Sequence, residues 1–142
     1  MNELLKYKEQ YDKLEIKKNL SGEEALREVE LNWSNIVYVK NPTEEMCLLA
    51  VKQNGLALQY ILNPSKMVCL EAIKQNPYSL CFILNQTEEM CLEAVKRDGL
   101  ATLYVKKPTK EIYLEAIKQD ITTLEYLDED IFKSELDYDV RF

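Results

Sequence analysis

Three cysteines recur at intervals of 22 residues, and their side chains are the most reactive groups in a repeating pattern of this chain. They are Cys47, Cys69 and Cys91. A column of thiolates could hold a soft metal ion or sense redox state. We expect these side chains instead to pack as small apolar groups, because neighbouring helices lie about 10 Å apart. That separation is too large for shared ligands or for a disulfide. Thiol-based sensing is the minor alternative.

The composition leaves little room for other chemistry. The chain has no histidine, which excludes Ser–His and Cys–His nucleophile pairs and any metal site that contains histidine. It has only three glycines, so a glycine-rich phosphate loop is not expected. We therefore expect a protein that is not an enzyme and that needs no cofactor.

Charged residues also recur with the 22-residue spacing and form the first candidate binding surface. Lysines occupy one register, and glutamates stand three residues before the last three of them. This charged ladder consists of Lys52, Lys74, Lys96, Lys118, Glu71, Glu93 and Glu115. Such i,i+3 pairs are neighbours on a helix and contribute only a few tenths of a kcal/mol. The ladder therefore suits a solvated face or a surface on which a partner docks across several units.

The acidic C-terminal region is the second candidate surface. The net charge is −7, and the segment from Glu125 to Phe142 carries −5 of it. We select as candidate contacts Asp128, Glu129, Asp130, Asp137, Tyr138 and Asp139. Concentrated negative charge keeps a chain soluble but repels itself. The segment could be a solubilising cap, or a negative patch for a basic partner.

A repeat of 22 residues positions all of these side chains. Five units follow one another without gaps, at 19–40, 41–62, 63–84, 85–106 and 107–128. The third residue of each of the last four units has a hydroxyl group suited to a helix N-cap: Thr43, Ser65, Thr87 and Thr109. The predicted helix then runs for about ten residues, to Gln53, Gln75, Arg97 and Gln119. Its apolar positions cover a wide arc, so each helix needs neighbours on both sides.

The second segment of each unit has two interpretations. Leu56, Leu58 and Tyr60 alternate as in a strand, which would give a horseshoe of the leucine-rich type. Ile61 is apolar too and breaks the alternation. We favour a short second helix. One aromatic residue per unit recurs here, at Tyr38, Tyr60, Phe82, Tyr104 and Tyr126. We interpret this column as core, although an exposed column would supply interface hot spots.

The repeat also resembles a known family. The motif T-x-E-x-C-L-x-A-V-K-x-N-G-x-A-L-x-Y is similar to the repeats of a family of domains of unknown function, found in large viruses and bacteria. More loosely, it resembles the leucine-rich variant repeats. The resemblance covers 41–128 well and 19–40 weakly. It implies an all-helical array, and it implies no catalytic residues and no defined activity.

Together these patterns predict an all-α fold. We expect a short α-solenoid of five two-helix repeats, with an N-terminal capping helix over 1–18 and an acidic cap or tail over 129–142. Caps are needed because the open ends of a repeat array expose apolar surface. No apolar run is long enough to span a membrane, and no signal peptide is recognisable. We expect a cytoplasmic protein with reduced cysteines.

The functional hypothesis is a non-enzymatic scaffold that binds a protein partner. A sharper version is an inhibitor or adaptor, encoded by a phage or another mobile element, that acts on a host protein. The alternative is an acidic mimic of nucleic acid that blocks a nuclease or a DNA-binding enzyme. Direct binding to nucleic acid is not expected, because the chain has no basic footprint.

Overall fold

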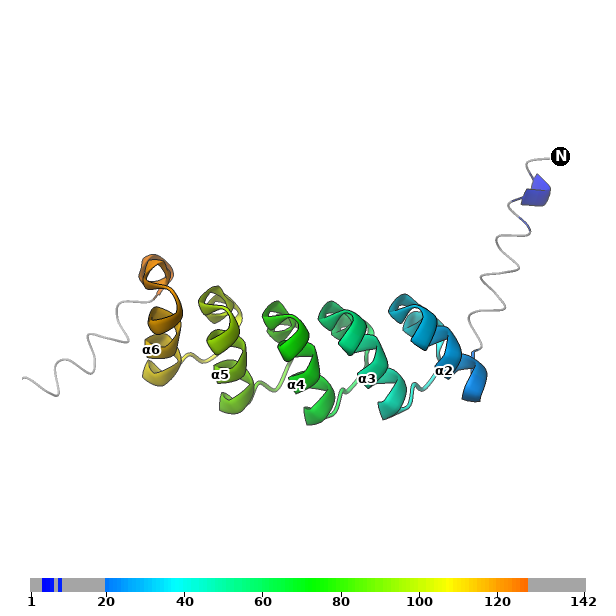
Figure 1. Cartoon of the computed structure of the whole chain (residues 1–142), viewed down its shortest axis with the longest axis horizontal. Coiled ribbons are helices and arrows are strands. Elements are labelled where there is room, and N and C mark those ends of the chain that lie inside the picture. Colours follow the sequence, from blue (N-terminus) through cyan, green and yellow to red (C-terminus); the bar gives the residue numbers. More distant parts are fainter. Residues whose placement is uncertain (1–3, 7, 9–19, 128–142) are drawn as a thin grey trace, which may run out of the picture.

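In the computed structural model, five α-helices stand side by side along one axis, and each is followed by a short 3₁₀ helix, labelled η (Figure 1). The structure describes residues 4–6, 8 and 20–127, and the counts apply to this part. In order, the elements are α2 (Gly22–Leu31), η1 (Trp33–Tyr38), α3 (Glu44–Gln53), η2 (Gly55–Tyr60), α4 (Lys66–Gln75), η3 (Pro77–Phe82), α5 (Glu88–Arg97), η4 (Gly99–Tyr104), α6 (Lys110–Gln119) and η5 (Ile121–Tyr126). Each α-helix contacts the next one. The array is therefore the predicted all-α solenoid.

The predicted N-caps are present in the four regular repeats. The hydroxyl oxygens of Thr43, Ser65, Thr87 and Thr109 each accept the backbone N–H three residues later, at 3.2–3.4 Å. These bonds satisfy amide groups that have no partner inside the first turn. In the irregular first repeat, Ser21 stands at the same place, and its side chain makes no capping bond.

A single Asn or Asp joins each α-helix to its 3₁₀ helix. In the second repeat, the backbone N–H of Asn54 donates to the carbonyl of Ala50 and completes α3. Its side-chain oxygen accepts the N–H of Leu56, at 3.0 Å, and starts η2. The residue itself is extended, at φ −151° and ψ 111°. The helical interpretation of the second segment is thus correct, the strand is wrong, and the helix is of the tighter 3₁₀ type.

The core is one continuous cluster that runs through the whole array. Each repeat contributes buried alanine and β-branched residues from its α-helix, and the first four repeats add buried apolar residues from the 3₁₀ helix or the following loop. In the second repeat they include Ala50, Val51, Leu58 and Ile61. A single repeat cannot enclose these side chains, so stacking supplies the burial.

Polar side chains at the end of the α-helices tie neighbouring repeats together. Gln53 donates from Nε2 to the carbonyl of Val29, and its Oε1 accepts the N–H of Trp33. Gln75 accepts the N–H of Gly55 in the same way. In the next repeat the residue is Arg97, which donates to the carbonyl of Lys74 at 3.2 Å. In these three repeats, the residue at this position therefore caps the C-terminal end of the preceding α-helix or the first turn of the preceding 3₁₀ helix, whereas Gln119 of the fifth repeat bonds to Glu115 of its own helix.

Both predicted caps fall largely on residues that the structure does not describe. Of the capping helix over 1–18, residues 4–6 and 8 are described and helical. The acidic cap over 129–142 lies outside the described residues. Among those that are described, no helix has both the length and the apolar character needed to cross a membrane.

Candidate interaction surface

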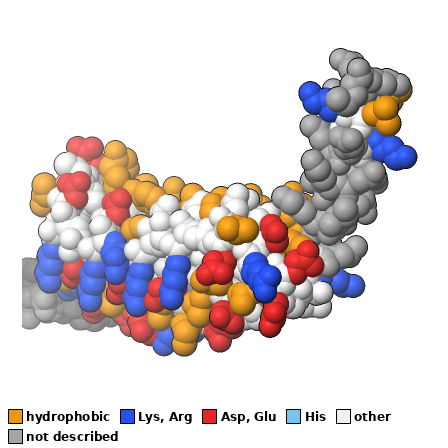
Figure 2. Space-filling model, turned by 45° about the vertical axis from the view of Figure 1, so that its right-hand side comes forward, with side chains coloured by type: hydrophobic (Ala, Val, Ile, Leu, Met, Phe, Trp, Pro, Cys, Tyr) orange, Lys and Arg blue, Asp and Glu red, His pale blue; other side chains and the backbone are white. Residues whose placement is uncertain are grey.

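The five 3₁₀ helices form one edge of the array, opposite the loops that lead into the α-helices (Figure 1). None of the helices η1–η4, each six residues long, contains a charged residue. This is a strong bias, because 30% of the residues in the chain are charged. In Figure 2, apolar side chains lie along this upper edge, and Lys and Arg side chains follow the flank below it. We call the outward side of η1–η5 the 3₁₀ face.

Four members of the aromatic column lie exposed on the 3₁₀ face, so the interpretation of the column as core is wrong for them, whereas Tyr38 is partly buried and packs against the core. The exposed fractions are 50% for Tyr60, 38% for Phe82, 42% for Tyr104 and 58% for Tyr126. The rings are exposed because each is the last residue of its 3₁₀ helix, and the side chain of the following residue points into the core instead. In the second repeat, Ile61 takes that inward place and is 8% exposed. The column therefore forms an apolar stripe on the surface.

Contacts between repeats hold two rings of the column, Tyr60 and Tyr104. Trp33 of η1 stacks on Tyr60 of η2, with ring centroids 6.3 Å apart. Tyr78 of η3 meets Tyr104 of η4 edge-on, at 5.6 Å. The hydroxyl of Tyr78 also donates to the carboxylate of Asp98, and this bond is the main cause that raises the pKa of the tyrosine. Rings held in this way lose little freedom when a partner binds.

Three hydroxyl groups on the 3₁₀ face remain available. The hydroxyls of Tyr60, Tyr104 and Tyr126 donate to no other residue in the part of the chain that the structure describes. Each of these side chains therefore offers a flat apolar ring and an unused hydrogen-bond donor. The 3₁₀ face can bind apolar groups and acceptors at the same time.

The charged ladder lies on the α-helices and is partly neutralised by its own members. Lys74 pairs with Glu71 at 3.4 Å, and Lys118 pairs with Glu115 at 3.7 Å. Glu93 pairs with Arg97, at 2.9 Å, rather than with Lys96. Among the described residues, no carboxylate lies within ion-pair distance of the two remaining lysines, Lys52 and Lys96. Exposed pairs of this kind contribute little to stability.

The second predicted surface is the acidic C-terminal region. Its candidates, Asp128, Glu129, Asp130, Asp137, Tyr138 and Asp139, lie outside the described residues. The last described acid of that region is Glu125 of η5. It is the one charged residue within the five 3₁₀ helices.

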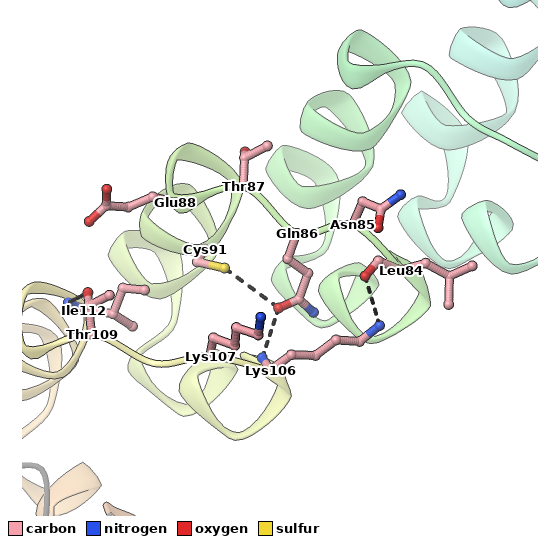
Figure 3. Close-up of a pocket in the computed structure, with 10 residues that line it drawn as sticks. All are labelled: Leu84, Asn85, Gln86, Thr87, Glu88, Cys91, Lys106, Lys107, Thr109 and Ile112. Atoms are coloured by element: carbon pink, nitrogen blue, oxygen red, sulfur yellow. Dashed lines mark hydrogen bonds between the residues drawn. The ribbon is translucent and has the colours of Figure 1, made fainter.

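A series of open pockets lies at the loop edge, between the N-terminal turns of neighbouring α-helices. The pocket between the fourth and fifth repeats has a volume of about 390 Å³ (Figure 3). Gln86 crosses it: Nε2 donates to the carbonyl of Tyr104, and Oε1 accepts the N–H of Lys106. Proline occupies the equivalent position in the neighbouring repeats, at Pro64 and Pro108. The sequence analysis missed Gln86, although the replaced proline was a visible signal.

The three recurring thiols are buried, as predicted, each within its own repeat. Cys47, Cys69 and Cys91 are between 3% and 5% exposed. Burial is the main cause that raises the pKa of each thiol. A raised pKa keeps a thiol protonated and a poor nucleophile near neutral pH. No group of three or more potential metal-binding side chains occurs among the residues that the structure covers.

Comparison with known families agrees with the repeat. The sequence model of the family described as Domain of unknown function (DUF4116) matches residues 43–86 and 87–133. The two matches together cover more than half of the chain. The chain belongs to the DUF4116 family. No curated protein and no solved structure matches it.

Each DUF4116 match spans two 22-residue repeats and begins at a capping threonine, Thr43 or Thr87. The structure shows one way in which the two repeats of each match differ. The first repeat of each match starts its 3₁₀ helix with glycine, Gly55 or Gly99. A Cβ atom at Gly99 would lie 2.9 Å from the carbonyl oxygen of Ala116, and at Gly55 the equivalent contact is closer still. The second repeat starts its 3₁₀ helix with another residue, Pro77 or Ile121. Successive repeats are therefore not equivalent.

Proposed function

We propose that this DUF4116 protein is a non-enzymatic scaffold that binds a protein partner along the 3₁₀ face. The observation that carries the proposal is the absence of charge from η1–η4 combined with the exposure of one aromatic side chain in each of the last four repeats. Contiguous apolar surface of this kind costs solubility and marks interaction sites. Depletion of charge and enrichment of aromatic residues distinguish the centre of protein interfaces.

The arrangement of the rings supports the same surface. Aromatic residues dominate interface hot spots, and hot spots cluster at the centre of an interface. On the 3₁₀ face the rings from neighbouring repeats touch, at Trp33–Tyr60 and at Tyr78–Tyr104. The charged ladder on the α-helices is the weaker candidate, because Lys74 and Lys118 are already paired with acids of their own helices.

The proposal extends to the cell compartment and to the biological role of the protein. A reducing cytoplasm suits four cysteines that are all free. An inhibitor or adaptor of a phage or mobile element, acting on a host protein, would use the 3₁₀ face as its contact surface. The alternative, an acidic mimic of nucleic acid, stays a prediction for the acids of 128–139.

Affinity capture with matched variants tests the proposal. The face variant carries Phe82→Ser and Tyr126→Ser, because neither ring contacts another aromatic ring in the described part. The flank variant carries Lys52→Ala and Lys96→Ala, two lysines without an ion pair among the described residues. Both variants are first checked for unchanged helical circular dichroism.

The expected result is a partner protein that the wild-type chain and the flank variant capture equally from cells that produce the chain. The face variant should capture at least about ten-fold less, because hot-spot truncations cost more than about 1 kcal/mol each. A partner lost with the flank variant and kept by the face variant would assign binding to the ladder instead. Failure of the wild-type chain to enrich any protein would end the scaffold proposal.

A further inference from the structure

We propose that Asn54 is a deamidation site that is closed while the second and third repeats are stacked and that reacts when they separate. Asn54 and Gly55 form the only Asn-Gly pair in the sequence. They join α3 to η2, at the boundary with the third repeat. The inference concerns the covalent chemistry of this junction and does not rest on the proposed function.

The reaction needs only these two residues and water. The backbone nitrogen of Gly55 attacks the carboxamide carbon of Asn54, a C–N bond forms, and the side-chain nitrogen leaves as ammonia with the proton that the backbone nitrogen gives up. Water then opens the cyclic imide at one of its two carbonyl groups, which gives either aspartate or isoaspartate. Asparagine is a thermolabile residue, and glycine favours the attack because no Cβ atom hinders its nitrogen or restricts its backbone.

Three features of the stacked array oppose the attack. The N–H of Gly55 donates to Oε1 of Gln75, a residue of the third repeat. The side-chain oxygen of Asn54 accepts the N–H of Leu56, at 3.0 Å, and this bond holds the carboxamide in place. The ψ angle of Asn54 is 111°, which turns the Gly55 nitrogen away from the Asn54 side chain. Ring closure needs both on the same side of the Cα–C bond, because reacting atoms must be in contact and aligned.

The third repeat keeps this geometry in place. Gly55 is buried, and its backbone packs so closely on the carbonyl oxygen of Ala72 in α4 that a Cβ atom would collide with that oxygen. The bond after the Cα of Asn54 therefore cannot rotate into the reactive geometry unless α4 moves away. The rate of deamidation then equals the rate in an open chain multiplied by the fraction of molecules in which this interface is open.

The two products differ in what they do to the array. Asp98 and Asp120 occupy the position of Asn54 in later repeats, with the same extended backbone and the same bond to the N–H two residues later. Aspartate at position 54 therefore fits the fold, as expected for two side chains that are equally good N-caps. Isoaspartate adds one main-chain carbon between α3 and η2, so the residue can no longer end one helix and start the next in the present geometry. A chain that forms isoaspartate keeps a weakened junction between two repeats.

Peptide mapping by mass spectrometry, on the full chain incubated at mildly alkaline pH, measures the rate of deamidation at Asn54. A synthetic peptide of residues 50–59 gives the rate of the open chain. We expect Asn54 in the native chain to react at least about ten-fold more slowly than in this peptide. Asn76 is the internal control and should not react, because the following residue, Pro77, has no N–H to give up.

Variants of the chain then test the role of the third repeat. Gln75→Ala removes the acceptor of the Gly55 N–H and should accelerate deamidation of Asn54 at least about five-fold. Gln119→Ala removes a carboxamide that bonds within its own helix and should change the rate by less than about two-fold. Asn54→Asp reproduces one product and should keep the urea midpoint of the wild type, whereas the purified isoaspartate form should unfold at lower urea.

Each contrary outcome overturns the inference. If Asn54 reacts as fast in the native chain as in the peptide, stacking does not protect it. If Gln75→Ala reacts no faster than the wild type, the third repeat does not control the reaction. If the peptide itself does not react, Asn54 is not a modification site. None of these outcomes affects the scaffold proposal, which is tested separately by the capture of a partner.

Discussion

The side-chain oxygen of Gln75 accepts the backbone N–H of Gly55, which begins the 3₁₀ helix of the preceding repeat. The N–H cannot be satisfied within its own helix, because it belongs to the first turn. Gln75 therefore completes a structural element that lies 20 residues earlier in the chain. The energy of this bond is an interface term between two repeats, and interface terms hold a solenoid together.

Replacing Gln75 by alanine should therefore destabilise the array. We expect Gln75→Ala to lower the free energy of unfolding by about 1–3 kcal/mol, because a buried N–H loses its acceptor. Urea denaturation followed by circular dichroism measures the change. Gln119→Ala is the matched control, since the carboxamide of Gln119 bonds to Glu115 of its own helix. Equal losses in both variants would show that the contact between repeats has no special role.

Pro77 and Arg97 should be energetically coupled. Pro77 has no backbone N–H that could donate a hydrogen bond. The residue of the next repeat at the position equivalent to Gln75 is Arg97, whose side chain has no acceptor atom. Pro77→Ala creates an N–H without a partner and should destabilise the chain. Adding Arg97→Gln supplies an acceptor and should recover about 0.5–1.5 kcal/mol in a double-mutant cycle. If the effects of the two substitutions on the free energy of unfolding are additive, Pro77 and Arg97 are not coupled.

Gly55 should tolerate no side chain. A Cβ atom there would collide with the carbonyl oxygen of Ala72, which belongs to rigid helix backbone. We expect Gly55→Ala to cost about 1–3 kcal/mol or more in thermal or urea unfolding. Gly99→Ala should cost less, because its closest contact would be 2.9 Å. A reversed order of these two losses would contradict the predicted packing.

The four cysteines should react with a thiol-specific reagent in two phases. Cys81 is exposed, whereas Cys47, Cys69 and Cys91 are buried. One equivalent of thiol should therefore react rapidly in the native protein, and the other three only as fast as the chain opens. Cys81→Ser should abolish the rapid phase and leave the slow one. Rapid reaction of two or more thiols would show that the array is looser than described.

The buried thiols should also make stability depend on alkaline pH. Their pKa is raised in the folded chain, mainly by burial. The unfolded chain then releases protons first as pH rises above about 8.5, the ordinary pKa of a thiol. Their contribution is complete below that pH and decreases above it, by at most about 1.4 kcal/mol per pH unit for each thiol. The triple variant Cys47→Ala, Cys69→Ala and Cys91→Ala should show a flatter profile between pH 8 and pH 10.

The sequence was sufficient for the α-helices and insufficient for the 3₁₀ helices. Capping hydroxyls and ten-residue apolar patterns gave the ends of α3–α6, such as Gln53 and Gln75, at the residues where the structure has them. The following six residues are too few for a period to be distinguished. In η2, Leu56, Leu58 and Tyr60 alternate as in a strand, yet only Leu58 is fully buried.

For the candidate site too, the residues on the α-helices were placed correctly from the sequence and those on the 3₁₀ helices were not. The position of the charged ladder on the exposed α-helical flank agrees with its spacing. The aromatic column was assigned to the core because tyrosine and phenylalanine are often buried, and residue type alone does not report direction. A better signal was present in the neighbouring residues. None of η1–η4 contains a charged residue, and depletion of charge is typical of the centre of an interface.

The pairing between Gly55 and Gln75, and between Pro77 and Arg97, limits how such an array can grow. Duplicating one 22-residue repeat, for example 85–106, would set an arginine against the N–H of a glycine. Duplicating 44 residues at once, for example 63–106, would instead place a glutamine after a repeat that has glycine and an arginine after a repeat that has proline, as Gln75 and Arg97 are placed now. Gene duplication would then lengthen the array in steps of two repeats, and family members should differ in length by even numbers of them.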